Sequence, residues 1–228
     1  RNNADGTFSD MTKATRLDKI MLTMGSNFGD LDNDGYLDFY IGTGAPDPRF
    51  ILPNRMFRND AGRVFQEVTA SGGFGTIMKG HGVAFGDIDQ DGDQDLYVVL
   101  GGAYEVDLAQ NQLFVNPGHG NNWITLRLQG VTMNRAAIGA RIKVSVTTPS
   151  GNRDIYSTVG SGGSFGASSL QQEIGLGKAT TIRSLSITWS STGKTDVYEK
   201  VGLNQAYLIR EGDAAPRTLV YDPVKLGG

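Results

Sequence analysis

Apolar and polar residues alternate along three segments in the second half of the chain. Every second residue is apolar within 124–128, 140–147 and 184–189. A period of two is typical of a strand with one buried face. These segments predict an antiparallel β-sandwich or small barrel, and we place its start near residues 118–120.

The first half contains short continuous apolar runs instead, at 39–41 and 96–100, each directly after an acidic loop. Such runs are typical of buried strands. The chain also has 32 glycines against 7 prolines. Glycine at that density, with β-branched and aromatic runs between, favours short strands joined by tight turns. The predicted fold class is therefore all-β.

The first half repeats itself in one register, which holds without a gap from Arg1 to Asn116. Arg1 aligns with Arg58, an offset of 57 residues, and this offset places RNNADGTFSDMT on RNDAGRVFQEVT and FGDLDNDGYLD on FGDIDQDGDQD. One register through separate segments indicates a duplication. A unit of this length supplies about four short strands, the content of a propeller blade, whereas a closed ring needs at least about four blades. We therefore expect a partial β-propeller from the C-terminal part of a larger protein.

The predicted organisation has three parts. Residues 1–117 form the repeats, 118–213 the sandwich, and 214–228 an extended tail in which 218–221 could add a strand to a neighbour. A glycine and serine run at 159–169 lacks the spacing and the following helix of a phosphate-binding loop, so it predicts a tight or mobile connection.

Each repeat contains a nine-residue loop with aspartates at its first, third, fifth and ninth positions, and a glycine that permits a sharp turn. Ca²⁺ takes six to eight oxygen ligands, and this pattern supplies several of them. Tyr36 and Asp93 occupy the same position of the two loops, so the expected ligand there is the backbone carbonyl. The pattern predicts two Ca²⁺ ions, with metal ligands from Asp30, Asp32, Asp34, Tyr36 and Asp38, and from Asp87, Asp89, Asp91, Asp93 and Asp95.

Two other interpretations of these loops fit less well. An EF-hand needs a bidentate glutamate at its twelfth position, which here holds Ile41 and Val98. Plain Asp-Gly turns need no metal, but they leave four carboxylates repelling one another. Calcium is therefore favoured, and its stabilising effect is expected in the repeats rather than in the sandwich.

Composition excludes several classes of function. Cysteine is absent, which rules out disulfides and thiolate metal sites, and two histidines are too few for a zinc cluster. A net charge of −3 without a basic run argues against nucleic-acid binding, and no apolar run is long enough for a membrane span. Because the first residue is Arg1 rather than Met, the start is expected to be processed or trimmed.

The motifs resemble known families. The FGD-x-D-x-DG-x-x-D loops and the N-x-x-F-x-N segments are similar to FG-GAP (VCBS) repeats, which build integrin-type propellers with calcium in the loops. NRAAIGARIKV and GSGGSFGASSLQQEIGLG resemble the ASPIC/UnbV domain. The pair is similar to the cartilage acidic protein family, whose members are mostly secreted. The resemblance implies an extracellular or periplasmic protein.

Two functions remain open. The first is a non-enzymatic calcium-binding module for adhesion, for binding a glycan or protein, or for extracellular assembly, in which further copies or missing blades complete the propeller. The alternative is an accessory or catalytic part of a polysaccharide-degrading enzyme of the lyase type. Its candidate catalytic residue is His81, beside Lys79. Because His81 aligns with Met24, the position tolerates an apolar group, and the non-enzymatic function is favoured.

Overall fold

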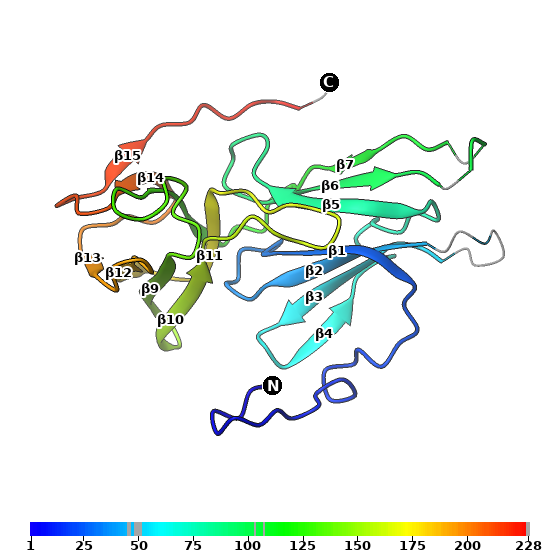
Figure 1. The fold of residues 1–228 in the computed structure, drawn as a ribbon, viewed down its shortest axis with the longest axis horizontal. Coiled ribbons are helices and arrows are strands. Elements are labelled where there is room, and N and C mark those ends of the chain that lie inside the picture. The colour runs from blue at the N-terminus through cyan, green and yellow to red at the C-terminus, as the bar shows by residue number, and fades with distance from the viewer. Residues whose placement is uncertain (45–46, 48–51, 103, 107, 227–228) are drawn as a thin grey trace.

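The computed structural model describes residues 1–44, 47, 52–102, 104–106 and 108–226 (Figure 1). Over these residues the secondary structure consists of strands in four small sheets, without helices, so the predicted all-β class is confirmed. It follows that no described segment is a helix able to cross a membrane.

The repeats form two antiparallel sheets, in the orders β1-β2-β3-β4 and β5-β6-β7. The 57-residue offset places β1 on β5 and β2 on β6 at both ends of each strand. The bounds are β1 Thr23–Gly29, β2 Asp38–Thr43, β3 Arg55–Asp60, β4 Val64–Glu67, β5 Gly80–Gly86, β6 Asp95–Leu100 and β7 Gln112–Phe114.

The two repeat sheets lie side by side along β1 and β5, like neighbouring blades (Figure 1). The Asn27 amide on β1 donates to the Val83 carbonyl on β5 at 3.1 Å. Tyr40 and Leu96, from the middle strands of the two sheets, are fully buried in one shared core. The predicted partial propeller is therefore present.

The sequence repeat extends beyond these two sheets. Asn2 and Phe8 pair as an isolated antiparallel bridge, and their equivalents Asn59 and Phe65 pair between β3 and β4. The first residues thus repeat the outer hairpin of a blade. In the second unit, the position equivalent to β4 begins at residue 121, directly before the first strand of the sandwich at Asn122, so the described part of this blade has three strands.

The second half is a sandwich of two sheets, in the orders β10-β9-β12-β13 and β11-β8-β14-β15. Buried aliphatic residues from both sheets and the fully buried Trp189 form its core. The bounds are β8 Asn122–Gln129, β9 Arg141–Thr148, β10 Gly151–Thr158, β11 Gln172–Gly177, β12 Thr181–Thr188, β13 Thr195–Tyr198, β14 Gln205–Arg210 and β15 Arg217–Leu219.

The sandwich departs from the prediction in two details. β14 pairs with β8 in parallel, because the chain crosses from β13 in one sheet to β14 in the other and enters beside β8 in the same direction. The tail adds β15 to its own sheet, against β14, rather than to a neighbour. Trp123 is only partly buried and packs over Gly92 of the second acidic loop, outside the sandwich core.

The glycine and serine run at 159–169 docks between β1 and β5 (Figure 1). Ser26 and Ser164 exchange two backbone hydrogen bonds, of 2.9 and 3.0 Å, and the Phe165 carbonyl accepts from the Val83 amide at 3.1 Å. A methyl group added at Gly166 would overlap the Val83 carbonyl. Glycine therefore permits the backbones to approach closely here, and the loop joins the sandwich to both blades.

Candidate metal centre

The two acidic loops occupy equivalent places, between β1 and β2 and between β5 and β6. In the first, the Asp30 carboxylate accepts from the backbone amides of Asp34 at 3.0 Å and Gly35 at 2.8 Å. Asp87 accepts in the same way from Asp91 and Gly92, at 3.0 Å each. These bonds need a turn with a left-handed residue, and Gly35 and Gly92 have φ of 83° and 95°.

The last aspartate of each loop ties the loop to its own blade. Asp38 accepts from the backbone amides of Leu31 at 2.8 Å and Asn59 at 2.7 Å. Asp95 accepts from the equivalent amides of Ile88 at 2.9 Å and Asn116 at 2.8 Å. The loop conformation is therefore fixed by the same hydrogen bonds in both repeats.

The loops bring carboxylates together in two clusters. Oxygen atoms of Asp30, Asp32 and Asp38 lie within 4.8 Å of one another, and so do those of Asp87, Asp89 and Asp91. The remaining predicted ligands lie in the same loops but outside these clusters. Asp34 accepts from the Tyr36 amide at 2.8 Å, Asp93 accepts from the Asn33 side chain, the Tyr36 ring faces Arg153, and Asp95 closes its loop as described.

Burial makes negative charge unfavourable in these clusters. It raises the pKa of Asp38 and of Asp87 to about 7. It also raises the pKa of Asp30 well above the usual range, with added repulsion from Asp38 and Asp34. The pKa of Asp89 is raised too, by burial and then by the charge of Asp91. A positive charge placed among them would therefore be stabilising.

One oxygen in each loop identifies where that charge would fit. Oδ1 of Asp32 and Oδ1 of Asp89 are buried and accept no hydrogen bond from any described residue. The two atoms are equivalent in the repeat. A buried acceptor without a partner lowers stability, and a hard cation bound in each loop would give that oxygen a partner. The residues of both loops therefore fit Ca²⁺.

The loops differ in one charged contact. Arg58 Nε lies 2.6 Å from Asp32 Oδ2 in the first loop. The position equivalent to Arg58 in the second repeat holds Val115. The first loop thus has a partial counter-charge from its own blade, whereas this position of the second blade supplies none.

The sandwich holds the first loop from outside. The Arg153 guanidinium donates to the carbonyls of Asp34 at 2.7 Å and Gly35 at 2.9 Å, and it lies 4.0 Å from the Tyr36 ring centroid. The Gly177 amide donates to the Asn33 carbonyl at 2.8 Å. Neither contact has a short-range sequence signal, because more than 100 residues separate Arg153 from the loop.

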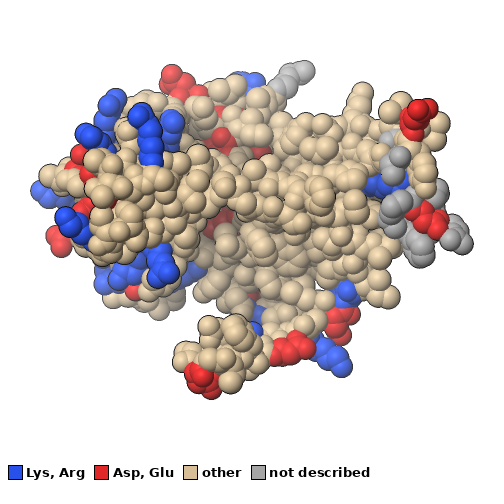
Figure 2. Space-filling view, in the orientation of Figure 1, with Lys and Arg blue, Asp and Glu red and all other residues tan. Residues whose placement is uncertain are grey.

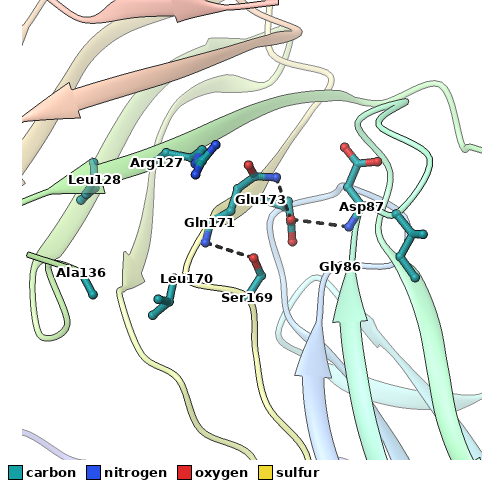
Figure 3. Close-up of a pocket in the computed structure, with 10 residues that line it drawn as sticks. Gly86, Asp87, Arg127, Leu128, Ala136, Ser169, Leu170, Gln171 and Glu173 are labelled. Carbon is teal, nitrogen blue, oxygen red and sulfur yellow. Dashed lines mark hydrogen bonds between the residues drawn. The ribbon is translucent and has the colours of Figure 1, made fainter. Parts of the chain in front are cut away.

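Glu173 on β11 connects both loops to the sandwich. It accepts from the Gln94 amide group at 2.8 Å, while Gln94 accepts from the Asp30 backbone amide at 2.7 Å. Gln171 also donates to Glu173, at 3.2 Å, and burial raises the pKa of Glu173. Figure 3 shows Glu173, Gln171 and Asp87 around a pocket of about 580 Å³ between the second blade and the sandwich.

The tail beyond β15 lies along the second loop. The Val224 amide donates to the Asp89 carbonyl at 2.7 Å. The Tyr221 hydroxyl donates to Gln171 at 3.0 Å. These residues were outside the candidate site predicted from sequence, because nothing in the tail resembles a ligand pattern.

The candidate catalytic pair lies at another part of the fold. His81 Nε2 is 3.0 Å from the Gly101 carbonyl, a backbone contact of a structural kind. Lys79 Nζ lies 5.5 Å from the Tyr104 ring centroid. Neither side chain belongs to the two carboxylate clusters found among the described residues.

Comparison with known families matches two models to the chain. The model of the FG-GAP-like repeat matches residues 46–98, and the ASPIC and UnbV model matches residues 130–216. The chain is an FG-GAP repeat protein with an ASPIC/UnbV domain. The first match contains the whole second acidic loop and most of β6, and the second contains β9 to β14. A search of curated proteins finds no match.

Proposed function

We propose that this FG-GAP and ASPIC/UnbV chain is a non-enzymatic, extracellular binding module whose two acidic loops each hold one Ca²⁺. The observation that carries the proposal is the pair of equivalent unpaired oxygens, Asp32 Oδ1 and Asp89 Oδ1, among carboxylates whose pKa values are raised. FG-GAP repeats are typically extracellular, which supports the location. The expected partner is a glycan or a protein.

In this proposal, both loops bind the ion through the same positions. The first, third, fifth and ninth residues supply carboxylates and the seventh supplies its backbone carbonyl. When bound, the ion neutralises the loop, while the chain's own amides keep the first and last aspartates in place. The ligands are Asp30, Asp32, Asp34, Tyr36 and Asp38 in one loop and Asp87, Asp89, Asp91, Asp93 and Asp95 in the other.

Calcium titration of the full chain tests this assignment. Calorimetry should detect two bound ions for the wild type and one bound ion for each of Asp32→Asn and Asp89→Asn. Each substitution replaces a charged ligand by a neutral side chain of similar size. Asp93→Ala should keep two ions, since only its carbonyl is a ligand. Asp60→Asn is the matched control, because this acid lies outside the loops and pairs with Arg63. Absence of calcium binding by the wild type would refute the proposal.

Calcium affinity should also rise with pH. In the metal-free chain, Asp38 and Asp87 have pKa values of about 7 against an ordinary 3.8. The folded chain therefore binds more protons than the unfolded chain between about pH 4 and 7. As pH rises through that window, these carboxylates lower the stability of the metal-free chain by a growing amount. Calcium must displace those protons. From pH 5.5 to 7.5 we expect at least about a tenfold gain in affinity, with proton release measured in buffers of different ionisation enthalpy. Equal affinities without proton release would contradict this.

A further inference from the structure

The charges of the chain are divided unequally between its two halves. Residues 1–117 carry nine Lys and Arg against seventeen Asp and Glu, a net −8, and residues 118–228 carry twelve against seven, a net +5. Figure 2 shows Lys and Arg side chains gathered over the sandwich, at the left of the view. The sandwich is therefore a basic domain within an acidic protein.

The outward face of the β10-β9-β12-β13 sheet presents part of this charge. Ile142, Val144 and Ile187 point into the core and are buried, so the residues that alternate with them point outward. Strand register arranges these outward residues in two rows across the sheet. One row is Tyr156, Lys143, Ser186 and Val197, and the other is Thr158, Arg141, Thr188 and Thr195.

The face is open to solvent and wide enough for an extended ligand. Tyr156 is 70% exposed and Val197 is 57% exposed, at the two sides of one row. Four strands give a width of about 14 Å, and Arg141 and Lys143, two residues apart, are separated by about 6.6 Å. The hydroxyls of Thr188 and Thr195 lie 2.9 Å apart between these side chains and the edge.

The two cations are available for a ligand. Lys143 pairs across the ladder with Tyr156 and Ser186, and Arg141 with Thr158 and Thr188, all uncharged. The acid on this face is Asp154, whose carboxylate lies 3.7 Å from Arg183. Asp196 on β13 is turned away and accepts from the Trp189 indole at 2.7 Å.

We propose that this face, defined by Arg141, Lys143, Tyr156, Thr188 and Thr195, binds an acidic polysaccharide. The cations bind carboxylate or sulfate groups, the Tyr156 ring packs against a sugar ring, and the threonines exchange hydrogen bonds with sugar hydroxyls. Even with Arg183, which lies near Asp154, the face has three cations, too few for nucleic acid, where tight binders make about six to ten phosphate contacts. A protein interface needs a buried apolar centre, and Tyr156 and Val197 lie at opposite sides.

The inference rests on the binding-module part of the proposed function and is independent of the calcium loops. The test measures binding of hyaluronan and heparin decasaccharides to the full chain, with calcium and with chelator. Hyaluronan offers carboxylates and heparin adds sulfates, so the better ligand identifies the anionic group. Oligosaccharide binding without calcium binding would refute the calcium proposal alone, and the reverse would refute this one alone.

Paired variants locate the site. Arg141→Gln with Lys143→Gln should weaken binding about tenfold, and Tyr156→Ala about fivefold. Arg210→Gln with Arg217→Gln removes the same charge from the opposite sheet and should change binding less than about twofold. Equal weakening by the two double variants would overturn the proposal, as would polyglutamate binding as tight as either decasaccharide. Melting curves check that each variant is folded.

Discussion

Removal of calcium is expected to lower the free energy of unfolding of the full chain by about 5 kcal/mol. Each site stabilises the folded chain by about 2.7 kcal/mol at a hundredfold excess of calcium over its dissociation constant, and the chain has two candidate sites. Without the ion, the raised pKa values of Asp30, Asp38 and Asp87 show that these carboxylates are poorly accommodated as anions. Denaturant unfolding near pH 7.5, with calcium or with chelator, measures the difference.

The Asp32→Asn and Asp89→Asn double variant is the control for this effect. Its midpoint should be the same with calcium and with chelator, because both ligand sets have lost a charged member. If the wild type unfolds at the same denaturant concentration in both conditions, the loops are plain turns and the calcium assignment is wrong.

The sequence alone predicts that this effect is confined to the repeats. The structure gives a reason for it to extend further, because Arg153, Glu173 and Gly177 of the sandwich all contact the loops or their neighbours. A loop that loses its ion is no longer held in the conformation that these residues contact. We therefore expect the sandwich of the full chain to unfold together with the repeats.

The parts of the fold that sequence reasoning found are those set by local pattern. The nine-residue acidic loops, the strands that follow them and the buried faces of β8, β9 and β12 each depend on residues close together in the chain. The repeat strengthened these predictions, because the offset that aligns Asn2 with Asn59 also aligns the strand pairs.

The parts that it missed depend on distant partners. Alternation shows which face of β8 is buried, but it does not choose between a parallel and an antiparallel neighbour, so the pairing of β8 with β14 was not predictable. Glu173 lies in the segment that resembles the ASPIC/UnbV domain, but that resemblance does not place it near the acidic loops. Its role there arises because β11 lies beside them. The docked 159–169 loop has the same origin, since glycine content allows close approach without naming the partner.

Arg153→Met is expected to lower the stability of the full chain by about 3 kcal/mol. The variant loses two hydrogen bonds from a charged donor, which are worth about 1.5 kcal/mol each at the low end. It also leaves the Asp34 and Gly35 carbonyls without this donor at a partly buried place. Methionine keeps much of the side-chain length but removes the guanidinium from the Tyr36 ring, so the loss reports on the hydrogen bonds together with that contact. Denaturant unfolding in calcium measures it.

Arg183→Met provides the comparison, because that guanidinium lies 3.7 Å from Asp154 and its side chain is 45% exposed. An exposed pair of this kind should contribute less than about 1 kcal/mol. Calcium titration adds a second readout that a general loss of packing would not produce. Arg153 fixes the carbonyls directly before Tyr36, so its replacement should lower the calcium affinity of the first loop. The second loop, to which Arg153 makes no hydrogen bond, should keep its calcium affinity. Equal weakening at both loops, or a loss of stability no larger than that of Arg183→Met, would show that Arg153 does not position the first loop.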